Sequence, residues 1–182
     1  MTIDVEKLQL NEIIVQTLKE MLENDLPTII KTLNESFKDG ITLQEPSSYL
    51  PYVPSISDEA GGMPIIGIGD QPTKFVDDLQ YEITGKHILA VIILYQSSNR
   101  ENLALSLRRY IRAIIWCIQQ DRERPLRKEE TYLSQKAGSW YTKYLGVEPG
   151  PLVGEHEPGQ PDMPTSWKSW SGLGLEFTRQ EI

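Results

Sequence analysis

The segment from residue 87 to residue 118 constrains the fold most, because it joins an apolar strand to a capped amphipathic helix. Residues 87–96, HILAVIILYQ, are apolar and largely β-branched, which predicts a central strand buried on both faces. Residues 98–101, SNRE, have the form of a capping box, in which Ser98 and Glu101 exchange side chain-to-amide hydrogen bonds. The unit therefore predicts a sheet with a helix packed on it, in the α+β class.

The predicted helix over residues 99–120 has two faces of different character. At 100° per residue, one face is continuously apolar and is assigned to the core; it holds Leu103, Leu107, Tyr110, Ile111, Ile114, Cys117 and Ile118. The opposite face holds Leu105, Arg109, Arg112 and Trp116, an unusual set for a surface turned to water. Two interpretations stay open. Either a local loop or arginine stems cover the indole ring, or the face is a subunit interface, where Trp and Arg are favoured.

Elsewhere the patterns are weaker. Apolar periodicity predicts a helix pair over residues 5–38, or one helix kinked near Pro27. Residues 41–63 are a connector rich in proline, serine and acidic residues, with a short strand near 50–53, and a further short strand follows at 64–69. Alternation predicts a β-hairpin over 79–96 and a closing strand over 173–178. Residues 121–135 are highly charged and are expected to form a solvated loop.

Residues 146–172 are rich in proline and glycine, and we expect them to form a long loop. Aromatic residues in and before this segment suggest that parts of it are anchored; they are Trp140, Tyr141, Tyr144, Trp167 and Trp170. A chain of 182 residues is most simply one domain, so residues 1–182 are expected to form a single α+β unit that includes this loop.

Composition excludes several classes of function. The formal net charge of −8 argues against a dedicated nucleic-acid binder, which needs clustered Lys and Arg. The single cysteine, Cys117, excludes an internal disulfide and fits a reducing compartment. The first residues, MTIDVE, lack the basic and apolar regions of a secretory signal, and no apolar run approaches the roughly 20 residues of a membrane span.

Candidate catalytic and metal sites fail on spacing. Glu155, His156 and Glu157 could in principle bind a divalent metal ion, but adjacent residues rarely converge on one ion. The other histidine, His87, is remote in sequence. Glu82 lacks the lysine two residues later that a restriction-type nuclease would need, because Lys86 comes too late. The glycines of residues 67–70 precede no phosphate-binding helix. We therefore expect no enzyme activity, no metal and no cofactor.

The segment from Tyr81 to Ile118 carries a family resemblance. Its core, HILAVIILYQSSNRENLALSLRRYIRAI, resembles the strand, polar turn and following helix of the tail terminator (tail completion) proteins of long-tailed phages and phage-derived particles. The helical N-terminus and the final LGLEFTRQEI agree in position only. The resemblance implies a small, mostly antiparallel sheet with helices packed on one face.

It also implies a function without catalytic residues. Such a protein forms a homo-hexameric ring in the virion neck, assembled in the host cytoplasm. The ring caps the tail tube, stops its polymerisation and joins it to the head–tail connector protein. Leu105, Arg109, Arg112 and Trp116 would then be a candidate subunit interface, and the acidic balance suits a lumen past which DNA slides. The 146–172 loop departs from compact family members, and Trp167 and Trp170 are its candidate partner contacts.

Two alternatives remain at this point. One is a different neck component, such as a head-completion protein, which would bind the portal side without affecting tube length. The other is a small cytoplasmic α+β enzyme or ligand-binding domain, whose melting temperature a metal or ligand would raise.

Overall fold

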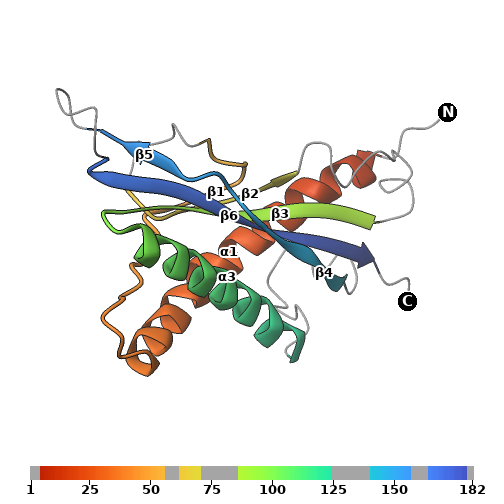
Figure 1. Cartoon of the computed structure of the whole chain (residues 1–182). Helices are drawn as coiled ribbons and strands as arrows, with labels where there is room; N and C mark the ends of the chain where they lie inside the picture. Colours follow the sequence, from red (N-terminus) through yellow and green to blue (C-terminus); the bar gives the residue numbers. More distant parts are fainter. Residues whose placement is uncertain (1–4, 56–61, 71–85, 124–139, 157–163, 180–182) are drawn as a thin grey trace.

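The structure, a computed structural model, describes residues 5–55, 62–70, 86–123, 140–156 and 164–179. In chain order its elements are α1 (Val5–Ser36), β1 (Ser48–Leu50), β2 (Ile65–Asp70), β3 (Lys86–Ser97), α3 (Arg100–Glu123), β4 (Trp140–Pro149), β5 (Val153–Glu155) and β6 (Ser166–Arg179). Figure 1 shows α1 (red to orange) and α3 (green) crossing each other alongside the sheet. Part of the predicted hairpin over 79–96 lies outside the described residues.

The six strands form one mixed sheet with the order β1-β2-β3-β6-β4, and β5 pairs with the start of β6. Among the described strands, β1 and β2 form the one parallel pair, and the other four pairs are antiparallel. The expected α+β class, with a mostly antiparallel sheet, is therefore confirmed. In Figure 1, β5 and β4 lie toward opposite ends of β6.

Strand β3 is buried on both faces, as its composition predicts. Residues 89–94 are all at most 6% exposed. Leu89, Val91 and Ile93 belong to the core shared with α1 and α3, whereas Ala90 and Ile92 point to the opposite face of the sheet. Both helices therefore pack on the same face, as expected, and β3 lies at the centre of the sheet.

The two helices supply the other half of this core. All seven residues predicted for the core face of α3 are buried. On α1, buried residues recur at helical spacing from Ile14 to Ile30, and the helix continues through Pro27. The chain therefore forms one helix there, and the alternative of a helix pair was wrong.

The cap of α3 lies one residue later than predicted. The Asn99 carboxamide oxygen accepts hydrogen bonds from the amides of Glu101 (2.8 Å) and Asn102 (3.1 Å). The Asn99 carbonyl accepts the first helical bond, from the Leu103 amide at 3.0 Å. Asn99 is thus the N-cap, a position that Asn fills as well as Ser does. The predicted Ser98–Glu101 capping box was wrong.

The long loop predicted over 146–172 was wrong where strands occupy 146–149, 153–155 and 166–172, and its residues 157–163 lie outside the described residues. β4 continues to Pro149, β5 occupies 153–155, and β6 begins at Ser166. The first half of β6 is rich in Ser, Gly and Trp, which gives a weak strand pattern. It nevertheless pairs with β3 along the whole length from Lys86 to Ser97, and this ladder decides the conformation.

Glycine at position 67 lets the connector cross the second face of the sheet. A Cβ added to Gly67 would overlap the Pro54 ring and come within 2.5 Å of the Tyr52 carbonyl oxygen. At Gly174, on the same face, the nearest atom to such a Cβ is Leu145 Cβ at 3.3 Å. The close approach at Gly67 involves backbone and a rigid ring, so it leaves little room for adjustment.

We expect Gly67→Ala to lower the free energy of unfolding by about 1–3 kcal/mol, because the methyl group overpacks this crossing. Urea unfolding followed by circular dichroism measures the change. Gly174→Ala is the matched control and should cost clearly less. Equal costs at the two positions would show that the 52–54 crossing is not tight.

Candidate functional site

The outer face of α3 exposes large apolar side chains. Leu105 is 41% exposed and Trp116 is 42% exposed. They are eleven residues apart, which places them on one helical stripe separated by about 17 Å. Arg108 and Arg112 lie between them and are exposed. We call these four residues the α3 stripe; within the described residues neither arginine forms an ion pair.

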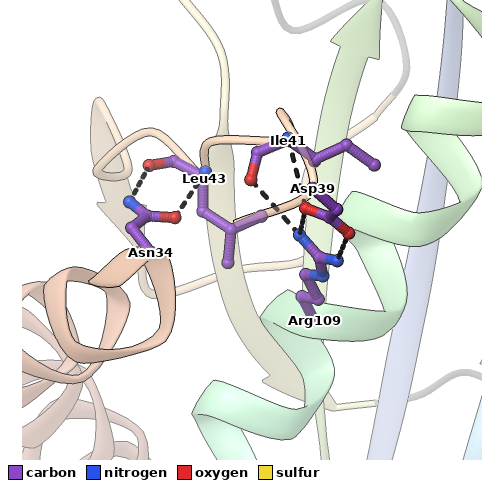
Figure 2. Close-up of polar contacts among 5 residues, drawn as sticks. All are labelled: Asn34, Asp39, Ile41, Leu43 and Arg109. Carbon is purple, nitrogen blue, oxygen red and sulfur yellow. Dashed lines mark hydrogen bonds and ion pairs between the residues drawn. The ribbon is translucent and has the colours of Figure 1, made fainter. Parts of the chain in front are cut away.

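Arg109, predicted for the same surface, is instead committed to a contact within the chain. Its guanidinium forms a two-pronged ion pair with the Asp39 carboxylate and donates to the Ile41 carbonyl at 3.2 Å (Figure 2). It also lies over the Phe37 ring, with its central carbon 4.4 Å from the ring centroid. Its side chain is only 12% exposed. The structure thus separates Arg109 from the other predicted interface residues.

Arg109 is one of three side chains that hold residues 37–45, which we call the strap. The Asn34 carboxamide donates to the Leu43 carbonyl and accepts from the Leu43 amide, both at 2.8 Å (Figure 2). The Tyr110 hydroxyl donates to the Gln44 carbonyl at 2.7 Å and accepts from the Gln44 amide at 2.9 Å. These contacts satisfy strap backbone groups that would otherwise be unpaired. The strap covers Arg109 and leaves Trp116 exposed.

A groove lies between the end of α1 and the strap. Its volume is about 300 Å³, and it is lined by Ile30, Lys31, Asn34, Glu35, Leu43 and Glu45. Ile30 and Leu43 are buried and give the groove an apolar part. Glu35, Glu45 and Lys31 are exposed, so the charged part of the groove holds two carboxylates and one ammonium group and is acidic on balance. We call it the α1 groove. The sequence did not predict this groove, because Leu43 and Glu45 reach α1 only through the folding of the strap against that helix.

The predicted partner-contacting residues Trp167 and Trp170 lie in β6, not in a loop. The Trp167 ring packs on the core and carries the Arg100 guanidinium 5.9 Å from its centroid. The Trp170 ring lies so close to Gly150 that no side chain would fit there. Both rings are half-buried. The assignment to a loop is therefore corrected: these residues fix the β5–β6 end of the sheet.

A buried charge reinforces that end. Lys168 is 3% exposed and forms an ion pair with Glu155. The second oxygen of Glu155 accepts from the Gln96 side-chain amide at 3.1 Å, and that amide also donates to the Ser166 hydroxyl at 2.7 Å. Glu155 is 36% exposed and Lys168 is enclosed, so only the carboxylate of this pair reaches water.

Tyr49, Tyr95, Tyr110 and Cys117 lie in or against the core. Burial raises the pKa of Tyr49, Tyr95 and Tyr110, which keeps these phenols neutral. Cys117 is buried against α1, with Sγ 3.9 Å from the Met21 carbonyl. Within the described ranges, no group of three or more His, Cys, Asp or Glu residues could hold a metal ion. Nor does any helix found there have the length and apolar character that crossing a membrane requires.

Comparison with known proteins adds no relative: no protein-family model matches the sequence, and no curated protein matches it.

Asp39 gives the strap a defined pH dependence. The hydrogen bond from Arg109 lowers the pKa of Asp39 below its ordinary value of 3.8. A carboxyl whose pKa is lower in the folded state stabilises that state above the ordinary pKa. This contribution is lost as the pH falls through the lower, folded-state pKa. Because Asp39 is exposed, the effect is moderated by solvent.

We expect Asp39→Asn to lower the urea midpoint at pH 7, with the difference from the wild type disappearing as the pH falls well below 3.8. Asp25→Asn is the matched control, since Asp25 is exposed and forms no ion pair with the residues described here. A difference between wild type and Asp39→Asn that stays constant into strong acid would contradict the ion pair.

The Lys168–Glu155 pair predicts unequal costs for removing its two partners. Glu155→Ala leaves a buried ammonium group without this carboxylate and should cost about 1–3 kcal/mol of stability. Lys168→Met leaves a carboxylate that can turn to water, so it should cost less. Denaturant unfolding of both variants measures the difference. A larger loss of stability in Lys168→Met than in Glu155→Ala would show that the carboxylate, rather than the ammonium group, is the partner that cannot be left unpaired.

Proposed function

We propose that this protein is a structural ring subunit of the tail terminator kind. In this proposal it assembles as a homo-oligomer, expected to be a hexamer, caps the tail tube of a long-tailed phage or phage-derived particle, and presents a surface to the head connector. It carries out no chemistry, and DNA passes through the ring without specific binding. Its place is the neck of the virion.

The observation that carries the proposal is the exposed α3 stripe. Two large apolar side chains, Leu105 and Trp116, are more than two-fifths exposed on a helix whose other face is fully packed. Trp and Arg are, with Tyr, the residues most enriched at the energetic centres of protein interfaces. The α+β fold, with both helices on one face of a mostly antiparallel sheet, agrees with what the sequence resemblance implies. The net charge of −8 is compatible with a wall that does not retain DNA.

The direct test of function uses the tube protein of the same particle. Adding this protein to polymerising tube protein should stop elongation and leave a ring at one tube end in negative-stain images. Tubes that elongate at the same rate, with bare ends, would exclude a terminator role. Binding to the connector without any effect on tube length would instead identify a different neck component.

The α3 stripe should be needed for assembly and not for folding. We expect Trp116→Glu, or Leu105→Glu, to reduce the mass in solution to that of the monomer while the melting temperature changes little. Light scattering and thermal unfolding measure the two properties. Val147→Glu is the matched control, because Val147 is 52% exposed on β4, and it should leave the mass unchanged. A large loss of monomer stability in the Trp116 variant would show that this residue belongs to the core.

A further inference from the structure

The α3 stripe and the α1 groove have complementary chemistry. The stripe places two cations, Arg108 and Arg112, between two exposed apolar side chains. The groove places two exposed carboxylates, Glu35 and Glu45, beside buried apolar groups, and they outnumber its one exposed cation, Lys31. No residue that the structure describes forms an ion pair with any of these four charged groups. The stripe is therefore a protruding basic surface, and the groove is a hollow whose net charge is negative.

The spacing within the stripe suits this groove. Arg112 and Trp116 are four residues apart, so they are neighbours on the helix surface, roughly 6 Å apart. A Trp116 ring entering the groove would therefore carry the Arg112 guanidinium to the acidic positions around it. Arginine also matches carboxylates well because its planar guanidinium donates several hydrogen bonds at once.

We infer that the α3 stripe of one subunit docks into the α1 groove of a second copy of this chain. Trp116 occupies the groove, and Arg108 and Arg112 pair with Glu35 and Glu45. This inference rests on the proposed ring function and specifies its subunit contact. Because the two surfaces are different parts of the chain, each subunit contributes one of each, and such a head-to-tail contact repeats around a closed ring.

The docking also gives the strap a role in assembly. Leu43 and Glu45 line the groove only because the side chains of Asn34 and Tyr110 hold the strap in place. Arg109 fixes the other part of the strap from α3. Helix α3 therefore supports the groove through Tyr110 and Arg109, and its outward residues form the stripe.

The test is an exchange of charge between the two surfaces. The stripe variant carries Arg108→Glu and Arg112→Glu; the groove variant carries Glu35→Lys and Glu45→Lys. Each variant alone juxtaposes like charges, so each should have the monomer mass by light scattering while retaining its circular dichroism spectrum. An equimolar mixture juxtaposes opposite charges at every contact and should recover the mass of the wild-type assembly.

The control is Glu12→Lys with Glu20→Lys, which makes the same charge change on exposed positions of α1 remote from the groove. It should assemble like the wild type. The pairing would be overturned if either variant assembled alone, or if the two monomeric variants did not assemble on mixing. If the wild type still formed rings in those cases, the proposed function would stand. A wild type that stays monomeric alone and with tube protein would overturn both.

Discussion

The enclosure of β3 is the constraint on which the remaining structure depends. Its side chains are buried on both faces, and its backbone pairs with β2 on one side and β6 on the other. One face receives α1 and α3, so the two helices must lie side by side and contact each other. The opposite face is crossed by the connector where Gly67 leaves space. The remaining strands extend this arrangement, since β1 pairs with β2, and β4 and β5 pair with β6.

The helix α3 links this core to the surface. Its inner face packs on β3, and the Tyr95 and Tyr110 rings meet edge to face with centroids 5.5 Å apart. The Tyr110 hydroxyl and the Arg109 guanidinium then hold the strap. What remains outward is a stripe of apolar and basic side chains that the described part of the chain does not cover. A monomer gains nothing from exposing Trp116, whereas an assembling subunit can bury it.

Sequence reasoning succeeded where a single strong pattern decides the structure. The core face of α3 and the buried character of β3 follow from apolar periodicity and composition, and both were correct. The cap was misplaced by one residue because Ser98 and Asn99 are both good caps. The first half of β6 was not predicted, because Ser169, Ser171 and nearby glycines give no strand pattern. Pairing with β3 and β4 makes this segment a strand. The strap could not be foreseen, since Asp39 and Arg109 are 70 residues apart.

The candidate interface was likewise predicted where helical periodicity decides exposure, and not where a contact distant in sequence does. Leu105, Arg112 and Trp116 are outward, as the helical periodicity predicted, while Arg109 serves the strap. We propose that these outward residues serve self-assembly, and the first measurement is the mass of the wild-type protein in solution, with negative-stain images of the same fraction. We expect six-fold rings with about six times the 20.8 kDa chain mass. A particle of 20.8 kDa at every concentration, and still without rings when tube protein is present, would exclude self-assembly through the α3 stripe.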